Sequence, residues 1–314
     1  MSNSKFKKGL SDPRGAVFYF QDKLERSASK LFFKNTAGFT NNIKGFMDSY
    51  KVKKINFDYN KTEKNLISEE FMNKGYVKIG SPYDPELIKQ ISSKFENYIL
   101  DKKFSYVRAK FQDDVYSRGL YRGHELIPES VQLLNDEIIN IIEQYYKTHF
   151  QVSKFSFWRN YFVPPEVNKE KELISSNWHC DASNTSWVKL FVYLTDVTED
   201  DGPFNVQSKE RTKKLMKMGY KNRSNYNLPQ DVIENEKYVW KATGDVGTAL
   251  MCNCNLGLHK AGIPEPGHYR DVIQFQFAPS NEPLSKDWYK TFVDPNEPIK
   301  SRSHHNEPVE DPNT

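Results

Sequence analysis

The residues best suited to chemistry are a closely spaced histidine and aspartate. His179 and Asp181 flank Cys180 in the segment NWHCDAS. Residues two apart in an extended segment project to the same face, so both side chains can bind one ion. His259 follows 78 residues later and offers a third ligand. Two histidines with one carboxylate suit non-haem Fe(II) and leave coordination positions open.

A histidine and an acid two residues apart are weak evidence alone, because the chain has seven histidines and repeats the spacing at His305 and Glu307. Arg270 strengthens the prediction. It follows His259 by 11 residues and lies at the start of the predicted strand YRDVIQFQF. A guanidinium fixed on a strand can hold a carboxylate through two hydrogen bonds. The set therefore predicts a metal site beside a site for a dicarboxylate.

Four segments together resemble the phytanoyl-CoA dioxygenase family of Fe(II)- and 2-oxoglutarate-dependent oxygenases. They are NWHCDAS, YLTDVTEDDGPFNV, GDVGTALMCNCNLGLHKAG and HYRDVIQF, and their order matches the family from about residue 65 to residue 280. The resemblance implies an α+β protein with a mainly β core, a double-stranded β-helix (jelly roll, cupin-like) with flanking helices. It also implies that His179, Asp181 and His259 bind Fe(2+) and that Arg270 binds 2-oxoglutarate.

The activity implied by the resemblance is oxidation of a C–H bond by O2 and 2-oxoglutarate, with hydroxylation of a small anionic metabolite as the first expectation. Oxidative cyclisation, desaturation or epimerisation in natural-product biosynthesis is the alternative. Asp181 disfavours halogenation, because halogenating relatives carry a small residue there. A non-catalytic metal-binding barrel and a zinc hydrolase are the competing interpretations. After the DGPF turn the chain reads VQSKERTKK instead of the family's Pro-Gly-Ser-His, so we expect the loop that faces substrate to differ.

Helices precede the strands that must hold these residues. The sequence predicts a short helix from residue 65, a strand from Tyr76 to Ile79, a helix from Pro85 with Leu87, Ile91, Phe95 and Ile99 on one face, and a helix over residues 128–147. Short β-branched and aromatic segments separated by turns predict an antiparallel region over residues 152–280.

Strand alternation predicts which side chains line the pocket. In residues 187–194, Val188, Leu190, Val192 and Leu194 share an aliphatic face that we expect to meet the helices. The other face carries the predicted pocket residues Trp187, Lys189 and Phe191, together with Tyr193. A buried lysine requires an anion. Lys189 therefore either binds an anionic group of substrate or 2-oxoglutarate, or lies at an exposed rim or in a structural ion pair.

Three further residues are candidates for contact with substrate. Gln274 shares the face of Arg270 on its strand. Asn160 and Tyr161 precede the metal motif, and alternation allows only one of them to face inward. His268 is interpreted as solvated, while Cys180, Cys252 and Cys254 are interpreted as packing residues because no further ligand pair completes a zinc site.

The 314-residue chain divides into three parts. Residues 1–64 carry 14 Lys and Arg against 6 Asp and Glu, so this basic extension has a charge of +8 while the chain has +4. We expect its phenylalanines to pack on an oxygenase domain over residues 65–295, followed by a flexible tail over residues 296–314. The near balance of charge disfavours a nucleic-acid partner. Three cysteines and no apolar segment of membrane-spanning length predict a cytoplasmic protein without a membrane span.

Overall fold

The computed structural model describes residues 64–181, 186–220 and 228–292. The predicted basic extension, apart from Lys64, and the predicted tail lie outside the described residues. None of the described helices is long and apolar enough to cross a membrane.

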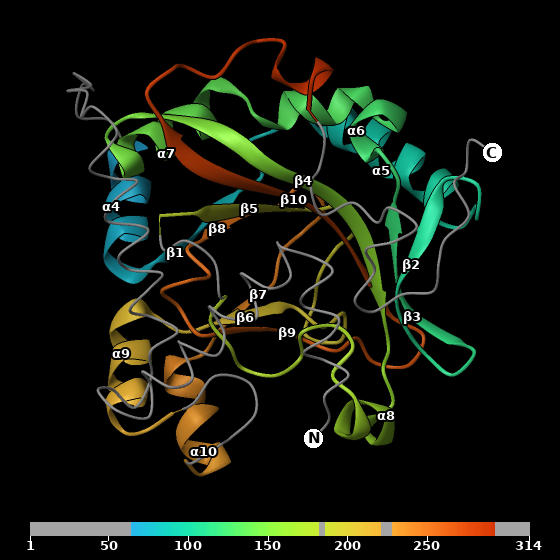
Figure 1. Ribbon diagram of the computed structural model, residues 1–314, viewed down its shortest axis with the longest axis vertical. Coiled ribbons are helices and arrows are strands. Elements are labelled where there is room, and N and C mark those ends of the chain that lie inside the picture. Colours follow the sequence, from blue (N-terminus) through green and yellow to red (C-terminus); the bar gives the residue numbers. More distant parts are fainter. Residues whose placement is uncertain (1–63, 182–185, 221–227, 293–314) are drawn as a thin grey trace, which may run out of the picture.

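Two antiparallel sheets face each other below a layer of helices (Figure 1). The larger sheet has seven strands, which are, in spatial order, β1 (Tyr76–Gly80), β8 (Ala249–Cys252), β5 (Val188–Tyr193), β10 (Tyr269–Ser280), β4 (His149–Tyr161), β3 (Asp114–Leu120) and β2 (Ser105–Phe111). The smaller sheet contains β7 (Trp240–Ala242), β6 (Phe204–Val206) and β9 (His259–Ala261). From β5 to β10 the chain passes repeatedly between the sheets, as in the predicted double-stranded β-helix.

The helices cover the outer face of the larger sheet and one end of the molecule (Figure 1). They are α4 (Lys64–Lys74), α5 (Pro85–Ile99), α6 (Gly123–Leu126), α7 (Asp136–Tyr146), α8 (Pro165–Glu170), α9 (Lys209–Lys217) and α10 (Gln230–Ile233). Short 3-10 helices span Pro128–Leu133, Glu236–Tyr238 and Trp288–Lys290.

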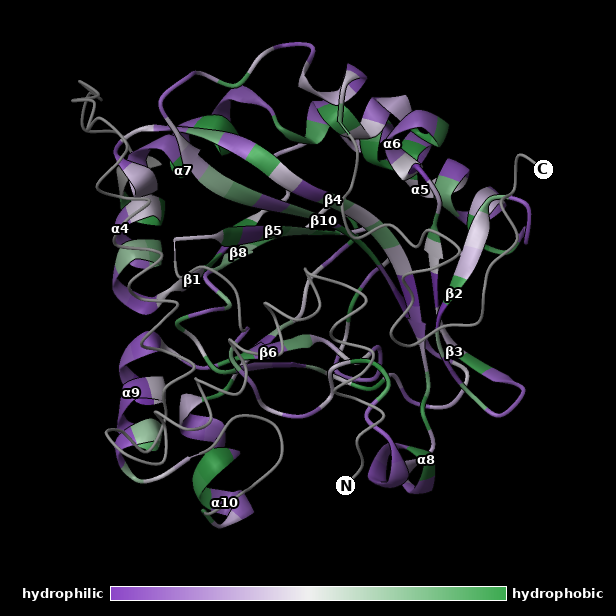
Figure 2. Ribbon diagram, in the orientation of Figure 1, coloured by the Kyte–Doolittle hydropathy of each residue, from purple (hydrophilic) through white to green (hydrophobic). Residues whose placement is uncertain are grey.

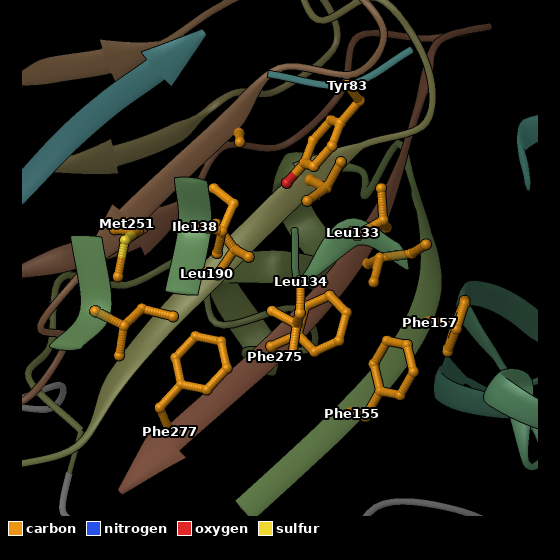
Figure 3. Packing of buried hydrophobic residues seen from close by; sticks show 14 of the residues in the cluster. Tyr83, Leu133, Leu134, Ile138, Phe155, Phe157, Leu190, Met251, Phe275 and Phe277 are labelled. Atoms are coloured by element: carbon orange, nitrogen blue, oxygen red, sulfur yellow. The ribbon is translucent and has the colours of Figure 1, made fainter. Parts of the chain in front are cut away.

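The main core lies between these helices and the outer face of the larger sheet. Ile91 and Phe95 of α5 and Ile138 of α7 are fully buried there, in one cluster with Leu190 and Phe275 of the sheet. Figure 3 shows members of this cluster: Ile138 of α7, Leu190 of β5 and Met251 of β8. Phe275 and Phe277 of β10 belong to the same cluster. Strands β8 and β5, which lie between β1 and β10 in the larger sheet, are largely green in Figure 2, as expected for strands buried on both faces.

Two predictions of secondary structure need correction. The single helix predicted over residues 128–147 is wrong: a 3-10 helix ends at Leu133, and α7 begins only at Asp136. Asn135 causes the break, because its backbone is extended and its side chain accepts a hydrogen bond from the amide of Ile138 at 3.0 Å. The β2–β3 hairpin was not predicted, although it extends the larger sheet.

Candidate active site

The backbone places the three predicted metal ligands together. His179 and His259 form an isolated antiparallel bridge, with the amide of each donating to the carbonyl of the other at 3.0 and 2.9 Å. The amide of Asp181 donates to the carbonyl of Cys254 at 2.8 Å. The segment that carries His179 and Asp181 is therefore held against the start of β9, whose first residue is His259, and against the chain that precedes it.

The ligand atoms of the three side chains converge. They all lie within 4.8 Å of one another, and no other such group of His, Cys, Asp or Glu occurs in the described part of the chain. Oδ1 of Asp181 lies 3.7 Å from Nε2 of His179 and 3.7 Å from Nε2 of His259. Both histidines are buried and Asp181 is half-buried, so the three donors are largely shielded from bulk water.

Backbone carbonyls fix which ring nitrogen of each histidine faces the centre. Nδ1 of His179 lies 2.8 Å from the carbonyl oxygen of Asn177, and Nδ1 of His259 lies 3.1 Å from that of Gly257. A carbonyl can only accept a hydrogen bond, so each Nδ1 carries the proton and each Nε2 keeps its lone pair. Partners of this kind orient histidines that bind metals. The donor set therefore fits a divalent metal ion with open positions.

Lys189 forms an ion pair with the aspartate of this group. Its Nζ lies 2.5 Å from Oδ2 of Asp181, so the two carboxylate oxygens have different partners. Burial acts to raise the pKa of Asp181, but the charges of Lys189 and the two histidines outweigh it and hold that pKa below the usual range of aspartate. Among the alternatives considered for Lys189, the structure shows an ion pair, and both of its members line the same cavity.

Arg270 enters the same cavity from β10, and no described residue forms an ion pair with it. Its side chain is buried, and its Nη1 has no hydrogen-bond partner among the described residues. Burial lowers the pKa of this guanidinium. A buried, unsatisfied cation costs free energy unless an anion binds there. The orphaned nitrogen therefore fits a carboxylate ligand.

Cross-strand contacts fix the position of Arg270. It pairs with Asn160 of β4, whose Oδ1 accepts a hydrogen bond from the hydroxyl of Ser117 at 2.8 Å. The next pair, Asp271 and Arg159, points to the opposite face. There Nε and Nη2 of Arg159 each lie 2.6 Å from an oxygen of Asp271. This buried bidentate pair fixes the register of β4 against β10 beside the Arg270 position.

The site opens into a cavity of about 400 Å³. The sequence-predicted residues that line it are His179, Asp181, His259, Arg270, Lys189, Phe191, Asn160 and Gln274. Trp187 and Tyr161 are not among the described lining residues. Of Asn160 and Tyr161, Asn160 is therefore the residue that faces inward. Trp187 lies just before the first residue of β5.

Several lining residues were missed by the sequence analysis. Lys154 and Trp158 share the inner face of β4 with Asn160, so alternation carried through that strand would have indicated them. Arg108 comes from the hairpin that was not predicted. Lys171 comes from the irregular segment after α8, where no periodic pattern exists.

The other candidates lie outside the cavity. The three cysteines are buried and form no disulfide, as expected of packing residues. His268 is not simply solvated, because its Nδ1 lies 2.9 Å from Asp201. The segment after the DGPF turn is wrongly predicted as a loop that faces substrate: Ser208 caps α9, and Lys209 donates to the carbonyl of Met72 in α4.

Comparisons with known proteins agree on the fold. No protein-family model matches the sequence, and no curated protein matches it significantly. Among solved structures, the chain is similar to the epimerase SnoN in complex with Fe3+, alpha ketoglutarate and nogalamycin RO, with 10% identity over 78% of this chain and 95% of that chain and a TM-score of 0.53. It is also similar to EctD from S. alaskensis in its apoform, with 12% identity over 76% of this chain and 85% of that chain and a TM-score of 0.51.

These likenesses confirm the predicted fold class, a mainly antiparallel β core of the double-stranded β-helix type with flanking helices. Another structure of SnoN describes it as a non-heme alpha ketoglutarate dependent epimerase from nogalamycin biosynthesis. At these identities the likeness concerns the fold, so the function of this chain is argued from its own residues.

Proposed function

We propose that this protein is a non-haem Fe(II)- and 2-oxoglutarate-dependent oxygenase that oxidises a C–H bond of a small molecule, with hydroxylation as the expected outcome. The observation that carries the proposal is one cavity lined by two features. These are the histidine and aspartate donors within 4.8 Å of one another and the buried Arg270, whose Nη1 lacks a partner. The first suits a metal with open positions, and the second suits the far carboxylate of a dicarboxylate.

Each residue has a defined task in this proposal. Nε2 of His179, Nε2 of His259 and Oδ1 of Asp181 hold the metal, while Lys189 keeps Oδ2 of Asp181 turned away from it. Arg270 anchors 2-oxoglutarate. When bound, iron and 2-oxoglutarate would supply the oxidising chemistry, in which 2-oxoglutarate and dioxygen give succinate and carbon dioxide, with one oxygen atom entering succinate and the other entering the substrate. Phe191 and Gln274 line the remaining cavity and orient the substrate.

Resemblance in the four quoted segments supports placing the chain with the phytanoyl-CoA dioxygenase family. Asp181 supports oxygenation rather than halogenation. The orphaned Arg270 supports an enzyme over a non-catalytic metal-binding barrel, because a buried cation without a ligand only destabilises the fold. Cyclisation, desaturation and epimerisation use the same residues and differ in substrate pose, so product analysis separates them. Three buried cysteines that form no disulfide are consistent with a cytoplasmic location.

Consumption of 2-oxoglutarate tests the proposal. With Fe(II), ascorbate and oxygen, the protein should convert 2-oxoglutarate to succinate even without substrate, and His259→Ala should abolish this conversion. His149→Gln is the matched control, because His149 contacts Glu143 outside the cavity and its loss should leave turnover intact. Absence of succinate from a folded, iron-loaded protein would contradict the proposal.

A further inference from the structure

The two segments that carry the metal-ligand histidines also contact side chains outside the cavity. Neighbouring residues of an extended segment point to opposite faces, so Trp178 and Lys260 point away from the side to which His179 and His259 point. Both histidines line the cavity, whereas Trp178 and Lys260 are not among its lining residues. A group that binds these two neighbours therefore acts on the metal ligands from the side away from the cavity.

One carboxylate binds both neighbours. Oε1 of Glu234 accepts a hydrogen bond from Nε1 of Trp178 at 2.9 Å and another from Nζ of Lys260. The ammonium group of Lys260 also lies 5.2 Å from the centroid of the Trp178 ring, within the range of a cation–π contact. Each of the three side chains thus contacts the other two, and together they join the segment of His179 to the strand of His259.

Burial makes the contact between Trp178 and Glu234 costly to lose. Trp178 is only 1% exposed and packs in a small core with Leu215, Tyr220, Ile233 and Leu258. A buried N–H group that loses its acceptor destabilises the fold, and a partly buried carboxylate that binds two donors is restricted in its own position. Glu234 therefore fixes the indole ring within this core.

The helical segment that carries Glu234 also binds the backbone beside each histidine. This segment includes α9 and α10, which lie together at one end of the molecule (Figure 1), and Glu234 directly follows α10. The hydroxyl of Tyr220 donates to the carbonyl of Trp178 at 2.5 Å, and the hydroxyl oxygen of Thr212 accepts a hydrogen bond from the amide of Leu258 at 2.8 Å. Trp178 and Leu258 each immediately precede a metal-ligand histidine, so one segment supports both ligands.

We infer that Glu234 is a positioning residue of the metal centre, and that its contacts with Trp178 and Lys260 set the spacing of the His179 and His259 rings. The centroids of these two rings lie 4.2 Å apart. This inference rests on the proposed function. The carboxylate holds the two neighbours together on one face of the bridged segments, so the histidine rings on the other face keep the arrangement that a shared ion needs.

Binding of Co(II) to the full-length protein tests the inference, because the d–d absorption of this ion depends on the geometry of its ligands. Glu234→Ala should raise the dissociation constant of Co(II) about tenfold and shift the absorption bands, as is typical when a partner outside the ligand set is lost. Lys260→Met keeps the hydrogen bond between Trp178 and Glu234, so it should raise the dissociation constant by less, about threefold.

Glu129→Ala is the matched control, because it removes another partly buried ion pair. Glu129 binds Lys94 between the 3-10 helix Pro128–Leu133 and α5, and neither residue lines the cavity. This substitution should lower the melting temperature but leave the Co(II) affinity and the absorption bands of the wild type unchanged. The comparison separates positioning of the ligands from a general loss of stability.

A combined variant shows whether Glu234 acts through its two partners. In Trp178→Phe/Lys260→Met protein both contacts with Glu234 are removed. Adding Glu234→Ala to this protein should therefore change the dissociation constant of Co(II) by less than about twofold, although the same substitution has a large effect in the wild type.

The outcomes that overturn the inference are specific. They are a wild-type affinity and spectrum in folded Glu234→Ala, equal effects of Glu129→Ala and Glu234→Ala on Co(II) binding, or a full further loss when Glu234→Ala is added to the combined variant. If Glu234→Ala does not fold, a wild-type affinity and spectrum of Lys260→Met overturns the inference instead. Failure of the wild type itself to bind Co(II) contradicts the proposed function, and this inference with it.

Discussion

The ammonium group of Lys189 lies 2.5 Å from Oδ2 of Asp181, while Oδ1 of the same carboxylate faces the Nε2 atoms of His179 and His259. One carboxylate thus joins a fixed cation to the proposed metal centre. The charge of Lys189 has two consequences: it opposes a dication at the centre, and it favours the dianion 2-oxoglutarate beside it.

Lys189→Met should separate these two effects. Without the lysine, Asp181 is a buried carboxylate that lacks its partner, so the metal-free protein should lose thermal stability. Added Fe(II) or Mn(II) should raise the melting temperature more than in the wild type, whereas the affinity for 2-oxoglutarate should fall about tenfold. Lys189→Arg keeps the charge and serves as the control. Equal weakening of metal and 2-oxoglutarate binding by Lys189→Met would contradict this role.

Arg270→Gln should impair 2-oxoglutarate binding selectively. Removing a buried hydrogen-bonded charge pair costs about 1.5–3 kcal/mol, so the dissociation constant of 2-oxoglutarate should rise about tenfold to a hundredfold. Arg270→Lys keeps the charge without the planar donor pair, so its dissociation constant for 2-oxoglutarate should lie between those of the wild type and Arg270→Gln. Calorimetry with Mn(II) measures both affinities. A parallel loss of metal binding would indicate a folding defect and would argue against the anchoring role.

His268 should titrate above the ordinary range of histidine. Its hydrogen bond to Asp201 is the main cause that raises the pKa of His268. A raised pKa in the folded state means that the contact stabilises the fold fully below the unfolded value of about 6.5, and that this contribution is lost as the pH rises through the folded value. In NMR titrations, Asp201→Asn should lower the midpoint of His268 much more than Asp200→Asn. Equal midpoints in wild type and Asp201→Asn would rule out the contact in solution.

The parts of the fold that follow periodic patterns could be predicted from the sequence. The helix over Pro85–Ile99 buries Ile91, Phe95 and Ile99 as predicted, and alternation placed Leu190 in the core and Phe191 in the cavity. The broken helix was missed because apolar spacing continues through Asn135, and only the side-chain cap reveals the break. The hairpin that carries Arg108 was missed although β2 alternates apolar and polar residues from Val107 to Phe111, because β3 mixes both kinds on one face and the register between the two strands shifts.

Site residues could be predicted from the sequence where one short segment holds them. They were harder to predict where the site forms from segments that are distant in the sequence. The spacing of His179 and Asp181 indicated a shared face, and the structure brings His259 to them through a backbone bridge. Sequence alone left the partner of Lys189 open, because the contact with Asp181 depends on how the metal segment lies against β5. Lys171 had no signal, since an irregular segment places it.

The most direct test of the central claim is anaerobic titration of the protein with Fe(II) and 2-oxoglutarate, followed by visible absorption. Chelation of the metal by the keto acid should give a charge-transfer band that saturates at one equivalent of iron. His179→Ala should abolish the band, and the remote His149→Gln should retain it. If folded wild-type protein gives no such band, or if His179→Ala retains it, the assignment of His179, Asp181 and His259 as an iron site for 2-oxoglutarate is contradicted.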